Sequence, residues 1–247
     1  MQAPELQLPS RPSPHRGAVT EPRSAALPWA RIQAWSGLLF AVFATLHLLN
    51  TALAALGPAA YNGMQRAMRP VQHLPLVEGG LILLPLVVHA VAGVARMRKR
   101  RGKRAPASRR ARLHRYAGYF LLAVMAGHVF ATRGPDWFYG IYPEFEGLAF
   151  TFQVLPQFFF VYYPILALAG LCHLVIGVPL ALGVVGWPVP MRLRRGPALW
   201  LPLALAGALL VLGVAGLGGL LGDVPDQSSH PFARKVVALT QPLLGNP

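Results

Sequence analysis

Four histidines, His47, His89, His128 and His173, interrupt apolar stretches that are otherwise suited to hydrocarbon. They occur one to a stretch and are spaced 42, 39 and 45 residues apart. A lone histidine in a membrane can serve simply to hydrogen-bond a neighbouring helix. Ionisable residues are rare there, so one in each of four consecutive stretches indicates a shared role. Imidazole is a common ligand of transition metals, and metal binding is the chemistry we expect.

The composition indicates that these stretches are membrane helices. The chain is 54% hydrophobic and only 13% charged, with a mean hydropathy of +0.45. A helix needs roughly 20 apolar residues to cross about 30 Å of hydrocarbon. Stretches near that length occupy 33–55, 75–95, 115–132, 157–185 and 198–221. We therefore expect an all-α integral membrane protein, a bundle of five transmembrane helices.

Residues 31–222 form the predicted membrane domain, and two segments flank it. Residues 1–30 are rich in proline and arginine, with no early apolar core, so a disordered arm is expected rather than a signal peptide. An organellar transit peptide fits less well, because prolines disrupt the amphipathic helix that such peptides use. Residues 223–247 form a tail.

The net charge of +15 is distributed as a topology signal. If the helices alternate, 18 of the 23 Lys and Arg lie on one side, most of them between Arg96 and Arg115. The positive-inside rule puts that side and the N-terminus in the cytoplasm and the C-terminus outside. Contact with anionic lipid then explains the basic loop better than binding to nucleic acid does.

Depth along the helices predicts how the histidines pair. At about 1.5 Å per residue, His47 and His128 lie roughly 20 to 24 Å from the inner surface. His89 and His173 lie nearer the middle and the inner side. Two facing histidines at each of two depths is the arrangement required for bis-imidazole ligation of two stacked b-type haems.

Glycines repeat with the same pairing. The first and third stretches read G-x9-H (Gly37, Gly118), and the second and fourth read H-x3-G (Gly93, Gly177). A glycine ten residues before an outer ligand lies near the depth of the inner macrocycle, where a missing side chain makes room for a porphyrin. The alternative is close packing of membrane helices, which also uses glycine.

Other chemistry finds less support. Zinc normally requires three or four converging ligands, and no carboxylate or thiolate cluster accompanies the histidines. The single cysteine, Cys172, excludes a CxxC site and a disulfide framework.

Four segments together carry a resemblance to a known family. They are RIQAWSGLLFAVFATLHLLN, LPLVEGGLILLPLVVHAVAGV, RLHRYAGYFLLAVMAGHVF and YYPILALAGLCHLVIGV. Over about residues 31–180 the chain resembles the cytochrome b subunit of succinate dehydrogenase and fumarate reductase, in its single-chain form with five helices and two haems. In that family the first and third ligands share the distal haem, and the second and fourth share the proximal haem.

The resemblance implies a membrane-anchor, non-flavin subunit of a succinate:quinone oxidoreductase. Electrons would pass between an iron-sulfur subunit, itself served by a flavoprotein subunit, and a membrane quinone. The dicarboxylate chemistry would belong to those partners on the inner face. Two haems in one anchor chain favour menaquinone over ubiquinone by analogy with the family. The bacterial inner membrane is favoured over an organellar one.

The resemblance also implies roles for polar residues at the helix ends. Glu78 lies 11 residues before His89 on nearly the same helix face, where it can carry protons for quinone. A solvated or capping glutamate is the alternative. Gln33, Arg31 and Arg115 are placed to hydrogen-bond the proximal haem propionates, although topology and lipid headgroups also explain the two arginines.

Two other classes of function remain open. One is the di-haem cytochrome b anchor of another quinone-linked dehydrogenase, with the same ligands and different soluble partners. The other is a haem-free membrane transport protein in which the histidines bind neighbouring helices or relay protons.

Overall fold

The computed structural model describes residues 28–99, 108–190 and 199–241. Every regular element in these ranges is helical, and none is a strand. The elements are α1 (Pro28–Leu53), η1 (Ala54–Leu56), α2 (Pro58–Gln72), the π-helical η2 (Leu76–Leu83), α3 (Leu84–Lys99), α4 (Arg109–Tyr139), α5 (Phe145–Val154), α6 (Pro156–Val185), α8 (Trp200–Leu217) and α9 (Pro231–Thr240).

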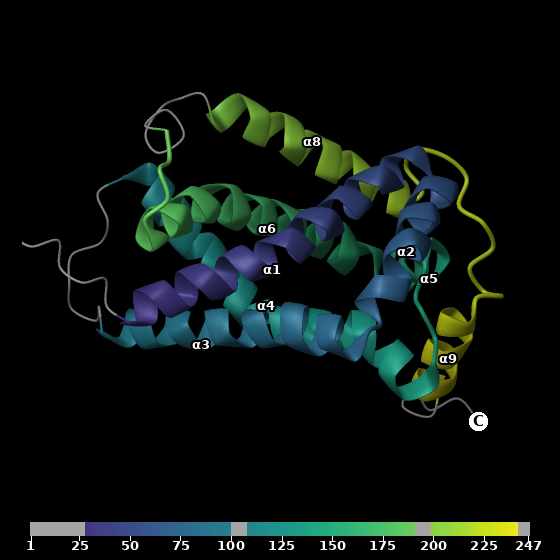
Figure 1. Ribbon diagram of the computed structural model, residues 1–247. Helices are drawn as coiled ribbons and strands as arrows, with labels where there is room; N and C mark the ends of the chain where they lie inside the picture. The colour runs from purple at the N-terminus through teal and green to yellow at the C-terminus, as the bar shows by residue number, and fades with distance from the viewer. Residues whose placement is uncertain (1–27, 100–107, 191–198, 242–247) are drawn as a thin grey trace, which may run out of the picture.

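The long helices form a bundle. Helix α1 packs against α3, α6 and α8, while α4 packs against α6. Figure 1 shows these helices running lengthwise, with α2, α5 and α9 gathered at one end. We call that end the capped end and the opposite end, where α3 finishes and α4 begins, the basic end.

Four helices are long and apolar enough to cross a membrane, by length and composition. They are Pro28–Leu56, Leu76–Lys99, Pro156–Val185 and Trp200–Leu217. Four of the five predicted stretches are therefore confirmed as candidate spans. The stretch predicted at 115–132 lies in α4, a helix of 31 residues. Polar residues such as Tyr119 and His128 make the middle of α4 less apolar than the other four.

Local signals set the helix ends. The Ser108 hydroxyl accepts a hydrogen bond from the Ala111 N–H at 3.2 Å and caps α4 at its start. The helix ends at Tyr139, and the following Gly140 caps it with a φ of 64°. Helix α1 begins at Pro28, so residues 28–30 are helical and not part of the predicted arm; the rest of the arm lies outside the described residues. Helix α9 occupies part of the tail expected after residue 222.

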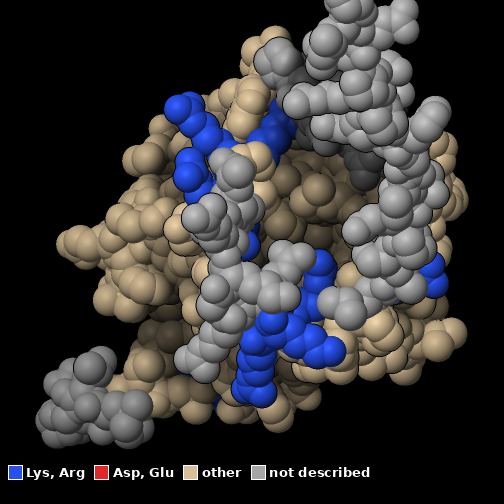
Figure 2. All heavy atoms as spheres, turned by 90° about the vertical axis from the view of Figure 1, so that its left-hand side faces the viewer, with Lys and Arg blue, Asp and Glu red and all other residues tan. Residues whose placement is uncertain are grey.

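The described acidic residues lie at one end of the bundle, and most of the described basic residues lie at the other. The described basic residues at the basic end are Arg31, Arg96, Arg98, Lys99, Arg109, Arg110, Arg112 and Arg115. Figure 2 looks onto this end and shows Lys and Arg side chains around it. The described acidic residues, Glu78, Asp136, Glu144, Glu146, Asp223 and Asp226, all belong to segments at the capped end. This separation is the one that the positive-inside argument predicted, but it does not by itself orient the protein in a membrane.

Packing is tightest toward the capped end. A buried cluster there joins η1, α2, α5 and α8 through Ala54, Tyr61, Phe145, Ala149, Phe152, Val214 and Leu217. Asn62 of α2 accepts from the Phe145 N–H at 2.8 Å and donates to Glu146 at 3.0 Å, which fixes α5 against α2. On α8, Gly213 faces the backbone carbonyl of Thr51, so α8 lies directly against the backbone of α1.

Candidate functional site

The four histidines of the apolar stretches meet in two pairs. The rings of His47 on α1 and His128 on α4 have centroids 5.9 Å apart with an interplanar angle of 69°. The rings of His89 on α3 and His173 on α6 are also 5.9 Å apart, at 89°. These are the pairs expected from depth. We call His47 with His128 the capped-side pair and His89 with His173 the basic-side pair.

The two pairs lie in separate layers. Gly37 on α1 faces His89, and Gly118 on α4 faces His173, so both glycines mark the basic-side layer. Each lies ten residues before a capped-side histidine on its own helix. At about 1.5 Å per residue, the two layers are roughly 15 Å apart along the bundle.

The separation within each pair fits one metal ion between two imidazoles. A ring nitrogen lies about 1.1 Å from its centroid and binds a transition metal at about 2.0 Å. Two imidazoles on opposite sides of one ion therefore hold their centroids roughly 6.2 Å apart, close to the 5.9 Å of both pairs. Among the described residues, no hydrogen bond joins the two rings of either pair, and their interplanar angles of 69° and 89° are those of an edge contact between rings.

Backbone carbonyls orient the basic-side rings. Nδ1 of His89 lies 2.9 Å from the carbonyl oxygen of Gln33. Nδ1 of His173 lies 3.2 Å from the carbonyl oxygen of His114. A carbonyl can only accept, so Nδ1 carries the proton in both rings and Nε2 keeps a lone pair. This is the outer-shell hydrogen bond that metal-binding histidines normally make.

The capped-side pair is supported differently. Threonines four residues after each histidine donate back to its carbonyl, from Thr51 to His47 at 3.1 Å and from Thr132 to His128 at 2.8 Å. The Phe43 ring stacks on His47 with a centroid distance of 5.6 Å. The H-x3-T pattern on both helices is a sequence signal that the histidine spacing alone did not use.

The matched glycines lie against the basic-side layer, but they make room for a different group than predicted. A Cβ on Gly37 would lie 2.7 Å from Cε1 and Nδ1 of His89, and one on Gly118 would lie 2.9 Å from Cε1 of His173. The missing side chains thus make room for imidazole rings, where room for a porphyrin was expected. A Cβ on Gly93 would similarly lie 3.1 Å from the amide nitrogen of Gln33, and one on Gly177 would lie 2.9 Å from Cε1 of His114.

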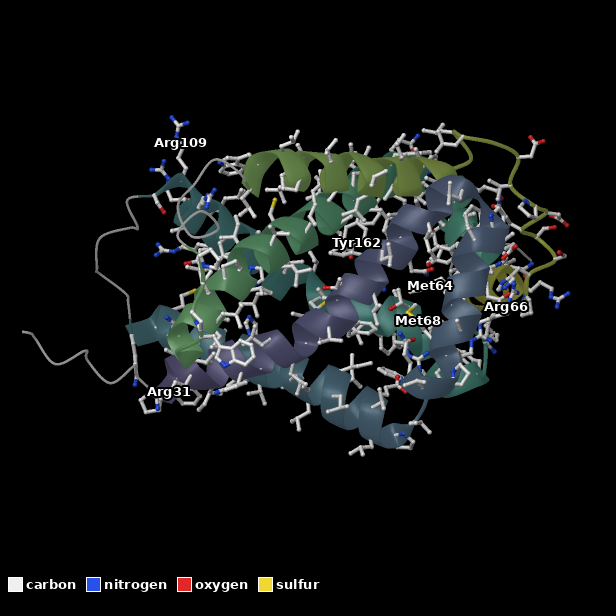
Figure 3. All side chains as sticks on the ribbon, turned by 45° about the horizontal axis from the view of Figure 1, so that its top comes forward. Arg31, Met64, Arg66, Met68, Arg109 and Tyr162 are labelled. Atoms are coloured by element: carbon white, nitrogen blue, oxygen red, sulfur yellow. The ribbon has the colours of Figure 1, made fainter. Side chains whose placement is uncertain are left out.

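The three residues expected at the propionates lie in different surroundings. The Gln33 side-chain oxygen accepts from Arg96 at 2.5 Å, so Gln33 belongs to the basic-side layer. Arg31 is exposed and projects from the basic end (Figure 3). Arg115 is half-buried near the start of α4. Arg96 and His114 also lie beside the basic-side layer, and the sequence analysis assigned no role to either residue.

Glu78 lies in a network of charges at the capped end. One carboxylate oxygen accepts from Arg133 at 2.8 and 2.7 Å and from the Trp137 indole at 3.0 Å. Arg133 also pairs with Asp136 at 2.9 Å, and Asp136 lies 3.6 Å from His73. The expected carboxylate facing the bundle is therefore ion-paired, in the π-helical η2, a helix type that is frequent at functional sites.

No family model matches this chain, and comparison with curated proteins and with solved structures finds no match either.

The donor set itself limits the metal that the histidines can hold. The described residues contain no cluster of three or more His, Cys, Asp or Glu that could bind an ion. Each pair supplies two imidazoles, and the ring of His114 stacks on that of His173. An ion held by two imidazoles would need its remaining ligands from a bound group, and a porphyrin would supply them. The residues therefore fit b-type haem better than zinc or copper.

Proposed function

We propose that the chain is a di-haem cytochrome b, the membrane-anchor subunit of a succinate dehydrogenase or fumarate reductase, relaying electrons between an iron-sulfur subunit and a membrane quinone. The observation that carries the proposal is the meeting of four histidines from four helices in two pairs, each with centroids 5.9 Å apart. The resemblance over residues 31–180 supplies the choice of complex.

In this proposal His47 and His128 hold one haem, and His89 and His173 hold the other. Each haem, when bound, would supply one-electron chemistry. The protein positions the ligands. The carbonyls of Gln33 and His114 fix the protonation of the basic-side rings, and Gly37 and Gly118 keep space for them.

The proposal makes α4 a fifth membrane span, because it carries His128 beside α1. At about 1.5 Å per residue, a helix of 31 residues is roughly 46 Å long, enough to cross hydrocarbon with both charged ends outside it. Five spans then put the N-terminus in the cytoplasm of a bacterium and the C-terminus outside the inner membrane. The basic end faces the flavoprotein and iron-sulfur partners.

Quinone chemistry is assigned to the capped end. Quinone reduction consumes protons, and Glu78 is half-buried there, beside Arg133 and Trp137. Only one of its carboxylate oxygens makes these contacts, which leaves the other to exchange a proton with quinone. We keep Glu78 as the proposed proton carrier, with Arg133 as the group that holds it, and menaquinone as the preferred quinone.

Single replacements of the four histidines test the ligand assignment. Each of His47→Ala, His89→Ala, His128→Ala and His173→Ala should lose about one haem, measured as the pyridine haemochrome per purified chain. His230→Ala is the matched control, since His230 caps α9 at the far surface, and it should keep both haems. Haem content unchanged in all five variants would reject the assignment. A chain that never binds haem would favour the transport alternative.

A further inference from the structure

A cavity of about 290 Å³ with mostly polar walls lies at the capped end. Helix α8 ends beside it, and the segment that follows α8 runs along this end of the molecule to α9 (Figure 1). The walls come from α5, from the end of α8 and from that segment. None of the four paired histidines lines this cavity, so it is separate from the proposed haem sites.

A buried amide oxygen in the cavity wall has no partner. Gln227 lines the cavity and is only 5% exposed, and its Oε1 makes no hydrogen bond. Buried polar atoms almost always have a partner, and an ion or an ordered water supplies it where the protein does not. Because this atom is an acceptor, the partner that it requires is a cation or a hydrogen-bond donor.

The end of α8 adds further acceptor oxygens. The N–H of Leu220 donates back to the carbonyl of Ala215 at 2.9 Å, and Gly219 takes a left-handed φ of 75°, which ends the helix. Among the described residues, no hydrogen bond reaches the carbonyl oxygens of Leu217 or Gly218, and both residues line the cavity. The carboxyl end of a helix also carries partial negative charge, which favours a cation there.

One carboxylate joins these neutral oxygens. Asp223 lines the cavity, and none of the described lining residues is a Lys, Arg or His that would neutralise it or repel a cation. Carboxylate, amide and backbone carbonyl oxygens are the ligands that Ca²⁺ takes, about six to eight of them, some from water. Mg²⁺ requires a smaller octahedral set, and zinc prefers nitrogen and sulfur, which this cavity does not offer.

We propose that this cavity binds a calcium ion through Asp223, Gln227 and the carbonyl oxygens at the end of α8, with water in the remaining positions. The ion joins α5, the end of α8 and the segment leading to α9, so binding stabilises the capped end. A site with one carboxylate should bind with a dissociation constant on the order of 1 mM, as extracellular calcium modules do. The proposed function places this end outside the cell, but the site itself contains none of the proposed haem ligands.

Thermal unfolding of the purified full chain in a non-ionic detergent tests the proposal. At about ten times the dissociation constant, CaCl2 should raise the Tm by about 3–6 °C. MgCl2 at the same concentration and NaCl at the same ionic strength should give smaller shifts. Asp223→Asn removes the charged ligand from an exposed position and should lose most of the calcium shift, which means at least about tenfold weaker binding.

Asp226→Asn is the matched control, because it removes the same charge three residues away, from a carboxylate that binds Ser228 rather than lining the cavity. It should keep the full calcium shift. Gln227→Leu, which removes the unpartnered oxygen, should lose the shift as Asp223→Asn does. The proposal is overturned if MgCl2 stabilises the wild-type chain as much as CaCl2, or if neither salt shifts its Tm. It is equally overturned if Asp223→Asn and Gln227→Leu keep the calcium shift, or if Asp226→Asn loses it.

Discussion

Replacing Gly37 by alanine would place a methyl group 2.7 Å from Cε1 and Nδ1 of His89. Real methyl carbons essentially never approach a ring so closely, so the imidazole or the helix must move. The ring cannot turn away freely, because its Nδ1 donates to the carbonyl of Gln33 at 2.9 Å. We therefore expect His89 to leave its position opposite His173.

The expected loss of haem affinity follows from two opposing contributions to the free energy. Alanine is favoured over glycine in a helix by about 1 kcal/mol, whereas overpacking a tight site costs about 1–3 kcal/mol. Gly127→Ala on α4 has the same helical gain, and a Cβ there meets nothing within 4 Å. Relative to that control, Gly37→Ala should weaken binding of the basic-side haem roughly 5- to 140-fold.

Titration of the apo chain with haemin, followed in the Soret band, measures this difference. The Gly37→Ala chain should bind one haem with the affinity of the Gly127→Ala chain and the second much more weakly. Two haems bound equally well by both variants would refute the claim that Gly37 makes room for a ligand.

Three further predictions concern the capped end and the α8 contact. Glu78→Gln should keep both haems but lower quinone reduction at least about tenfold in the assembled complex, and full activity would remove Glu78 from the quinone site. Asn62→Ala should destabilise the chain by about 1–3 kcal/mol, because it leaves the buried N–H of Phe145 without an acceptor; an unchanged Tm in detergent would contradict this. Gly213→Leu should lower the free energy of unfolding by about 3 kcal/mol in the same measurement, since the leucine side chain would meet the backbone of Thr51, which cannot turn aside. A Tm equal to that of wild type would show that α8 can move away from α1 at no cost.

The helices and the histidine pairs were accessible from sequence because both depend on regular spacing. Apolar length identifies a span, and a rise of 1.5 Å per residue converts position into depth. Pairing follows from depth once the helices alternate in direction. The glycine pattern was found for the same reason, although its partner proved to be an imidazole.

Contacts that depend on how one helix is rotated toward another could not be predicted from the sequence. His114 lies among Arg112 and Arg115, so its surroundings in the sequence indicated water, whereas in the fold its ring lies against α6. Glu78 and Arg133 are 55 residues apart, and no spacing rule links them. The helices α2, α5 and α9 were not predicted, because they lie outside the long apolar stretches on which the prediction of membrane spans depends.

The most direct test of the account is a count of haem in the purified chain. A dithionite-reduced minus oxidised spectrum with a pyridine haemochrome assay, on folded protein from haem-replete cells, should give two b-type haems per chain. A folded chain with no Soret band would contradict the central claim and leave the paired histidines as packing or transport residues.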